Sequence, residues 1–401
     1  MRCDICRSKA ARWAELLWAK STKLRLLLQG PPWLWPRTRS QRCLGLRRSC
    51  ERCMSMPGRS CIRKQTGPWL PGARRAWRMV FAVSCLMRCE LEGRAGRPLE
   101  ALRLVDLGLI LGGPETFVAP GLFQHARSLA FELSESPSAK RPRQGRLFEA
   151  GTEVLPTLRR RCAQREEVDL ETFLVSHFAP KTPLILRKGC AWPAVRRWSE
   201  ASFWCGGPLG QRFVPVETDY WMDEGFKIMQ LCDFVQHCSE VEGHSSAPSR
   251  GGYLAQHALF DQLPELEADI LTPELALCGE GSLLRQVFFG PEGTVTPLHF
   301  DPYENIFCQV VGVKYLRLFP PSESENLYPR EGDLSNNSRL EPADLLAGES
   351  AEGAYGDFPK LQKAEFQEAV LQPGDLLYLP MGWWHYVKSF STSISIAFHF
   401  T

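Results

Sequence analysis

Apolar and polar positions repeat with two different periods along this chain. Apolar side chains spaced three and four residues apart predict amphipathic helices in four segments: residues 98–111, 117–133, 167–178 and 226–238. From residue 286 onward the pattern changes to short, mostly alternating runs, which Gly, Pro and Asp separate and which predict strands. We therefore expect a helical region followed by a strand-rich C-terminal part.

The predicted strands of the C-terminal part are residues 286–289, 295–300, 306–319, 369–371, 376–379, 385–390 and 394–400. Shorter runs predict strands further upstream, at residues 184–186, 213–216 and 253–257. Because no long helix separates the C-terminal runs, the pattern favours an antiparallel sandwich or barrel.

The composition is that of a folded protein. The chain has 401 residues, of which 44% are hydrophobic, and it contains 22 Phe and 12 Trp. These values exclude a wholly disordered chain, and the length suggests two or three domains. No apolar run reaches about 18 residues, so we expect no membrane-spanning helix.

The net charge of +3 conceals a strong asymmetry. Residues 1–100 contain 22 Lys and Arg against 6 Asp and Glu, which gives +16 and leaves −13 for residues 101–401. Eight of the fifteen cysteines also lie before residue 100. We therefore divide the chain into three parts: a basic, cysteine-rich extension (1–97), a short helical region with a linker (98–164) and a β-rich domain (165–401).

Several interpretations of residues 1–97 remain open. Two cysteine pairs have the internal spacing of a four-thiolate zinc site, although more than forty residues separate them: Cys3 with Cys6, and Cys50 with Cys53. Residues 10–28 are compatible with an organellar presequence, and the positive charge is compatible with a tail that binds nucleic acid. We favour a poorly ordered extension. The seven later cysteines are scattered singly, which suits a reducing compartment.

The first candidate for chemistry lies in residues 296–305. His299 and Asp301 are two residues apart, so both side chains would lie on one face of a strand. One imidazole and one carboxylate are two of the three ligands of the facial triad, which holds Fe(II) and leaves open coordination positions. The pair alone is weak evidence, because an ordinary surface strand would also explain it. It needs a distal histidine.

His385 is the preferred distal histidine. It follows a Pro-Gly-Asp turn at residues 373–375, a short strand, and Gly382, which permits a tight reversal of the chain. The next strand then begins at His385 and closes over the strand of His299, as a double-stranded β-helix requires. The candidate metal ligands are therefore His299, Asp301 and His385.

Lys314 provides an independent indication of a ligand-binding site in the same part of the chain. On the predicted strand 306–319 it shares a face with apolar residues, and an ammonium in such surroundings is costly unless it is paired. Either Lys314 lies at a frayed strand edge, or it binds the distal carboxylate of 2-oxoglutarate. Asn305 and Thr296 can add hydrogen bonds to the same co-substrate, and Tyr253 can supply a phenol hydroxyl.

The motifs of the β-rich domain resemble those of JmjC domains, the Fe(II)- and 2-oxoglutarate-dependent oxygenase branch of the cupin superfamily. The blocks that are similar are residues 214–217, 252–266, 289–305, 311–320 and 373–385. They occur in the order typical of the family, and the similarity covers roughly residues 165–401. The resemblance implies a mainly β fold, a double-stranded β-helix of the cupin or jelly-roll type, with a helical N-terminal region.

The resemblance also implies cofactors and residue roles. Fe(II) would be held by His299, Asp301 and His385, and O₂ would be a co-substrate. The second co-substrate, 2-oxoglutarate, would be bound by Tyr253, Thr296, Asn305 and Lys314. Gln256 and Glu217 would line the substrate pocket, with Glu217 as a partner for a substrate guanidinium. The end of the chain departs from the family's Trp-rich strand, so the role of His399 stays open.

Three functions follow as hypotheses. We favour hydroxylation of a protein on arginine C3, because no cage for a methylammonium can be assigned. The alternatives are a JmjC histone lysine demethylase, and a catalytically silent cupin-like binding protein, against which the complete triad and Lys314 argue. The negative charge of residues 101–401 suits a basic or histone-like protein or peptide partner, and direct nucleic-acid binding stays open. We expect the nucleus, the cytoplasm or both, with an organellar presequence as an alternative.

Overall fold

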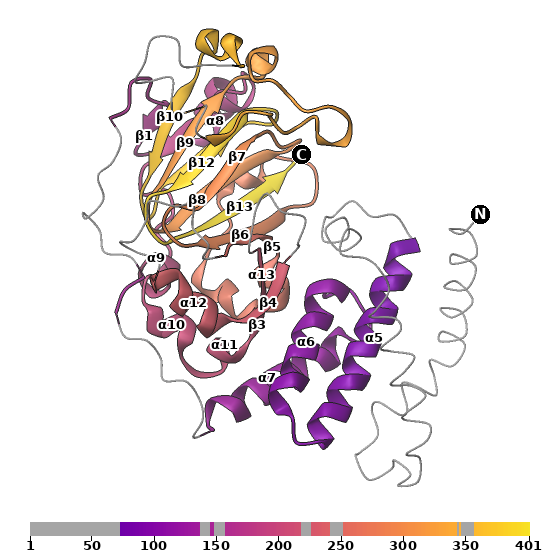
Figure 1. Cartoon of the computed structure of the whole chain (residues 1–401). Coiled ribbons are helices and arrows are strands. Elements are labelled where there is room, and N and C mark those ends of the chain that lie inside the picture. Colours follow the sequence, from indigo (N-terminus) through magenta and orange to yellow (C-terminus); the bar gives the residue numbers. More distant parts are fainter. Residues whose placement is uncertain are drawn as a thin grey trace, which may run out of the picture. The chain divides into compact units, whose positions relative to one another are not determined.

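The computed structural model describes residues 73–136, 145–147, 157–217, 226–240, 252–342, 345 and 357–401. The interpretations of the N-terminal extension as a zinc site, a presequence or a nucleic-acid-binding tail concern residues that lie outside these ranges. The chain divides into two compact units, one helical and one rich in strands (Figure 1). Among the described residues, no helix is long and apolar enough to cross a membrane.

Three helices form the helical unit: α5 (Ala73–Arg94), α6 (Pro98–Gly112) and α7 (Ala119–Ser134). The structure confirms α6 and α7 close to their predicted bounds. The sequence pattern does not predict α5, which lies in the segment expected to be poorly ordered, so the structure differs there from the expectation. Its residues Ala82, Leu86 and Cys89 recur at helical spacing and are buried in one core with α6 and α7.

A buried ion pair joins α6 to the start of strand β3 (Phe213–Glu217). The Arg212 guanidinium donates to Asp106 Oδ1 from Nε at 2.9 Å and from Nη2 at 2.6 Å, and the backbone N–H of Phe213 donates to Oδ2 at 2.8 Å. Both charged side chains are buried. Because a buried carboxylate is tolerated only when it is paired and hydrogen-bonded, this arrangement explains a charge within an apolar helix.

The β-rich unit is built around two sheets (Figure 1). The larger sheet contains, in spatial order, β1 (Gln164–Arg165), β2 (Leu184–Leu186), β11 (Leu376–Leu379), β8 (Glu304–Val311), β13 (Ser393–Phe400), β6 (Leu284–Gly290) and β5 (Leu254–His257). The smaller sheet contains β10 (Gln367–Leu371), β9 (Lys314–Phe319), β12 (Trp384–Ser389) and β7 (Val295–His299). All pairings are antiparallel except β1 with β2.

Successive strands alternate between the two sheets, first in the series β6 to β9 and again in β11 to β13. This is the connectivity of a double-stranded β-helix, so the predicted fold class is confirmed. Apolar residues of both sheets form a common core, among them Leu316 and Leu371 of the smaller sheet and Leu377 and Ala397 of the larger one.

The prediction of one strand over residues 306–319 is wrong, because the chain changes sheets in the middle of that segment. β8 ends at Val311 and β9 begins at Lys314. Between them Gly312 has a φ of +73°, and a Cβ at this position would lie 2.1 Å from the carbonyl oxygen of Thr392. Only glycine fits such a reversal.

Two predicted helices also differ from the structure. Residues 226–238 begin as strand β4 (Phe226–Gln230), which pairs with β3, and only then form helix α12 (Leu231–Glu240). Residues 167–178 form one α-helical turn, α8 (Leu170–Phe173), followed by a π-helical turn (Leu174–Phe178). The other short α-helices in the described part of the chain are α9 (Pro193–Arg197), α10 (Ala201–Cys205), α11 (Gly207–Gln211) and α13 (Leu259–Gln262).

Candidate active site

One face of the smaller sheet gathers candidate residues from three strands. His385 in β12 pairs with His299 in β7 and with Leu318 in β9. Four residues further along β12, Ser389 pairs with Lys314. Because side chains alternate between the two faces of a strand, His299, His385 and Lys314 lie on the same face.

A β-bulge adds Thr296 to this face. Thr296 and His299 are three residues apart, so a regular strand would place them on opposite faces. The register shifts between His385 and Val387, so that Val387 pairs with Thr296 and β7 contains one extra residue. Both Thr296 and His299 consequently line the same pocket.

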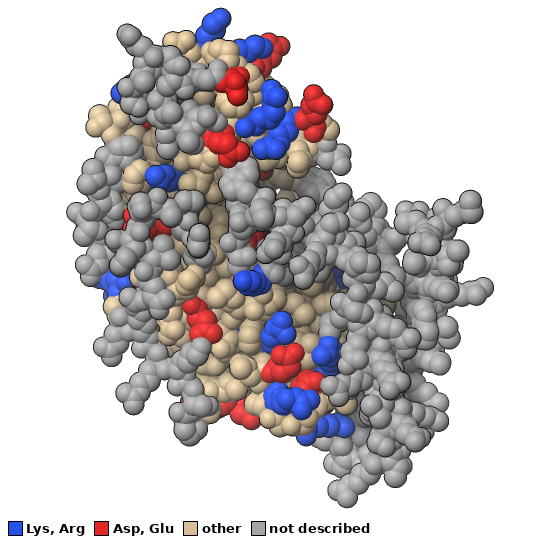
Figure 2. Space-filling view, in the orientation of Figure 1, with Lys and Arg blue, Asp and Glu red and all other residues tan. Residues whose placement is uncertain are grey.

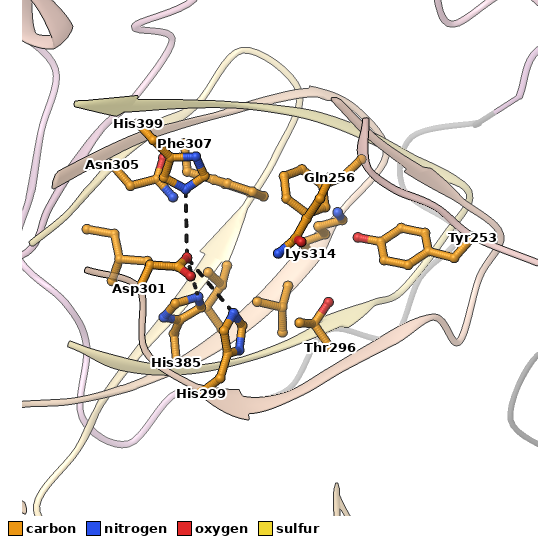
Figure 3. A pocket seen from close by; sticks show the side chains of 14 residues that line it. Tyr253, Gln256, Thr296, His299, Asp301, Asn305, Phe307, Lys314, His385 and His399 are labelled. Carbon is orange, nitrogen blue, oxygen red and sulfur yellow. Dashed lines mark ion pairs between the residues drawn. The ribbon is translucent and has the colours of Figure 1, made fainter. Parts of the chain in front are cut away.

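The pocket lies between the two sheets (Figure 3). The smaller sheet contributes the residues above together with Leu316. From the opposite side come Tyr253, Gln256, Phe288, Asn305, Phe307, Leu379 and His399. Figure 3 shows the three candidate metal ligands at one end of the pocket, whereas Lys314 and Tyr253 lie toward the other.

His299, Asp301 and His385 are brought together as predicted. Their potential ligand atoms all lie within 4.8 Å of one another, and Asp301 Oδ2 is 4.0 Å from Nε2 of His299 and 3.8 Å from Nε2 of His385. The spacing suggested that Asp301 lies in the strand, but it lies in the loop between β7 and β8.

The hydrogen bonds of the two imidazoles suit a metal. Nδ1 of His299 donates to the carbonyl oxygen of Pro297 at 2.8 Å, and Nδ1 of His385 donates to that of Trp383 at 3.0 Å. These bonds place the proton on Nδ1 and leave the lone pair of each Nε2 directed at Asp301. Two nitrogens and one carboxylate, with space beside them, match the donor set of a non-haem Fe(II) site.

The electrostatics of the cluster favour the ligand forms of these side chains. Burial, together with the neighbouring ring of His299, lowers the pKa of His385 to about 3, so the imidazole is neutral near pH 7. Burial acts to raise the pKa of the Asp301 carboxyl, but the imidazoles of His399, His299 and His385 together bring it well below its usual value. Asp301 is therefore ionised.

Lys314 is fully enclosed, with 2% of its surface exposed, which excludes the frayed strand edge considered above. Among the described residues, no carboxylate forms an ion pair with it. Its Nζ instead lies 5.5–5.8 Å from the ring centroids of Tyr253, Phe288 and Phe307. Burial lowers the pKa of Lys314 to about 7. A buried ammonium without an anion is a position that an anionic ligand would fill.

Of the other residues predicted to bind co-substrate or substrate, some line the pocket and one does not. Gln256 and Asn305 line the pocket, and Gln256 has a φ of +50°, which is strained for a residue other than glycine. Glu217 is joined to Tyr253 by two backbone hydrogen bonds, Glu217 N–H to Tyr253 O at 2.8 Å and Tyr253 N–H to Glu217 O at 2.7 Å. Glu217 is not among the residues that line the pocket.

Sequence reasoning did not predict the walls of the pocket. Phe288, Phe307, Leu379 and Val387 are apolar strand residues, and alternation alone shows that they face inward without showing that a ligand site lies there. His399, whose role was left open, also lines the pocket, with its Nε2 3.7 Å from Asp301 Oδ2.

Comparison with known proteins assigns the family. The model of a cupin-like domain matches residues 170–401. A protein named lysine-specific demethylase JMJ30, from Arabidopsis thaliana, is 33% identical over 365 residues, which are 83% of this chain and 82% of that protein. The chain therefore belongs to the cupin-like JmjC family, whose members are 2-oxoglutarate oxygenases.

Two further relatives show how much of the chain the similarity covers. A protein named lysine-specific demethylase 8, from Danio rerio, is 31% identical over 379 residues, 87% of each chain. A protein named Jumonji C domain-containing protein 5, from Drosophila melanogaster, is 35% identical over 248 residues, 59% of this chain and 58% of that protein. The first of these alignments covers more of the chain than the cupin-like domain, so the similarity extends upstream of that domain.

Proposed function

We propose that this chain is an Fe(II)- and 2-oxoglutarate-dependent dioxygenase that hydroxylates a protein substrate on arginine C3. The observation that supports it best is the two-ended pocket, with a metal-ligand triad at one end and the buried ammonium of Lys314 near the other. A ligand with a keto acid group for the metal and a second carboxylate for Lys314 suits both ends. 2-Oxoglutarate has this structure.

The residue roles follow from their positions. Bound Fe(II) would activate O₂, with one oxygen atom entering succinate as 2-oxoglutarate loses CO₂ and the other entering a substrate C–H bond. His299, Asp301 and His385 would hold the iron. Lys314 would fix the distal carboxylate, assisted by hydrogen bonds from Thr296 and Tyr253, and Asn305 would contact the co-substrate near the metal. The apolar walls would limit the access of water.

The positions of the aromatic side chains in the pocket favour hydroxylation over demethylation. Recognition of a methylammonium employs aromatic faces around the cation. Tyr253, Phe288 and Phe307 are aromatic residues of the pocket, and all three already surround the chain's own Lys314. Demethylation of methyl-lysine remains the second candidate, because two of the relatives above are named lysine-specific demethylases.

The substrate side of the proposal rests on Gln256 and Glu217. The strained backbone of Gln256 is held by the amide of Gln286, which donates to its carbonyl oxygen at 3.1 Å and so helps to orient a side chain in the pocket. Glu217, adjacent to Tyr253, would pair with the substrate guanidinium. On the face seen in Figure 2, acidic and basic side chains of the described residues are interspersed, so the proposal depends on Gln256 and Glu217 rather than on surface charge.

The test is turnover of a peptide library that contains both arginine and methyl-lysine peptides, with Fe(II), 2-oxoglutarate and the full chain. We expect succinate together with the gain of one oxygen atom on arginine. Loss of a methyl group from lysine with release of formaldehyde would instead support the second candidate. Asp301→Ala should abolish succinate formation, whereas Glu365→Ala, which changes an exposed carboxylate outside the pocket, should not. Unchanged turnover in Asp301→Ala would contradict the metal assignment.

A further inference from the structure

His399 is a buried histidine to which the proposed function assigns no role. It is 4% exposed, and within the described part of the chain neither ring nitrogen has a hydrogen-bond partner. A neutral imidazole has one N–H to donate and one lone pair to be satisfied, and leaving both unmet in a buried place is costly. The side chain is therefore set up for an interaction that forms when the site is filled.

The packing of strand β13 holds His399 toward the pocket. Its neighbours Phe398 and Phe400 face the other side of the strand, where their rings lie 6.0 Å from Trp192 and 6.3 Å from Phe178. Because alternate residues of a strand face opposite sides, His399 is directed inward. It is paired in register with Asn305, whose Oδ1 is also buried and has no hydrogen-bond partner among the described residues.

The position of His399 relative to Asp301 distinguishes it from the two candidate ligands. Its Nε2 is 3.7 Å from Asp301 Oδ2, comparable with the distances from His299 and His385 to the same oxygen. Figure 3 shows it on the opposite side of the carboxylate from those two rings. His399 also does not belong to the group whose ligand atoms all lie within 4.8 Å of one another. It contacts the carboxylate rather than the space that a metal would occupy.

We infer that His399 is a positioning residue for the metal centre, a role that rests on the proposed function. Its Nε2–H donates to the Asp301 carboxylate from behind and holds that carboxylate toward His299 and His385. A shortening of about 0.6 Å brings the 3.7 Å separation into hydrogen-bond range. Each carboxylate oxygen has two lone pairs, so Asp301 can accept this bond and bind a metal at the same time.

Metal affinity is the direct readout of such a role. Loss of an outer partner of a metal ligand typically weakens metal binding about 10- to 100-fold. Mn(II) is a redox-stable probe for a site of this donor type, and electron paramagnetic resonance measures the free ion. We therefore compare Mn(II) dissociation constants of the full chain for the wild type, His399→Phe, and His399→Gln, whose amide can still donate. Phe398→Leu, on the other face of the same strand, is the matched control.

The inference predicts that His399→Phe binds Mn(II) about 10- to 100-fold more weakly, while His399→Gln and Phe398→Leu stay within about 3-fold of the wild type. Wild-type affinity in His399→Phe would overturn it. An equal loss in His399→Gln or in Phe398→Leu would overturn it too, because the effect would then come from a metal–nitrogen bond or from damage to the strand. A wild-type chain that binds no Mn(II) would instead refute the proposed function itself.

Discussion

Replacing Lys314 by Met should make the ligand-free protein more stable while removing 2-oxoglutarate binding. Burial lowers the pKa of Lys314 from 10.5 to about 7, and the unfolded chain restores the ordinary value. Between these two pH values the unfolded state binds one proton more than the native state. The free energy of unfolding of the wild type therefore rises with pH there, by about 1.4 kcal/mol per pH unit from this group.

The size of the effect follows from the same two pKa values. The penalty of the buried amine is complete below pH 7 and disappears as the pH approaches 10.5. Relative to a neutral side chain of similar length, it amounts to about 4 kcal/mol at pH 7 and about 2 kcal/mol at pH 9. Lys314→Met should exceed the wild type in stability by these amounts, since Met fills nearly the same volume and has no charge.

Urea unfolding followed by tryptophan fluorescence at pH 7 and pH 9, without 2-oxoglutarate, measures both differences. Adding 2-oxoglutarate at a hundred times its dissociation constant should then stabilise the wild type by about 2.7 kcal/mol and leave the variant unchanged. Lys388→Met, which alters a lysine on the opposite face of the neighbouring strand β12, should behave like the wild type in both respects. If the free energies of unfolding of the wild type and Lys314→Met differ by the same amount at the two pH values, the reasoning is refuted.

Three further changes test other parts of the structure. His385→Ala should abolish both Mn(II) binding and succinate formation, and retention of either would speak against its assignment as a ligand. Asp106→Ala removes the carboxylate that pairs with the buried Arg212 guanidinium, so thermal unfolding should show a loss of about 3–5 kcal/mol; a loss below about 1 kcal/mol would contradict the buried pair. Gly312→Ala adds a Cβ 2.1 Å from the Thr392 carbonyl oxygen, and chemical denaturation should show more than about 2 kcal/mol of destabilisation. A stability equal to the wild type would disprove that close approach.

The sequence was most informative where side chains that can bind a metal lie within a short segment that also has the alternating pattern of a strand. His299 and Asp301 are two positions apart in the sequence, and His385 follows a recognisable turn, so these residues could be named as a candidate ligand set. The spacing did not predict that Asp301 lies outside the strand. Lys314 was found for a different reason, since a charge among apolar strand residues demands an explanation. Its predicted strand was nevertheless wrong, because the change of sheet at Gly312 depends on contacts with a distant segment.

Other features were not predictable because they depend on distant pairings. Thr296 and His299 share a face only through a bulge that the register with β12 creates. The contact between His399 and Asp301 joins the last strand to a loop almost a hundred residues earlier. Helix α5 depends on a core shared with α6 and α7, and the basic composition of its surroundings obscured its apolar stripe.

His299, His385 and Lys314 lie on one sheet, so the register of its strands fixes the distance between the two ends of the pocket. His385 and Ser389 are four residues apart on β12, and Ser389 is the cross-strand partner of Lys314, so the two ends are offset by about 13 Å of backbone. That offset cannot change without breaking the hydrogen-bond ladder between β9 and β12. A dicarboxylate one carbon shorter than 2-oxoglutarate, such as oxaloacetate, could reach the metal or the ammonium, but it would bridge them less well. In the proposed enzyme, co-substrate length is thus selected by the backbone register as well as by the side chains.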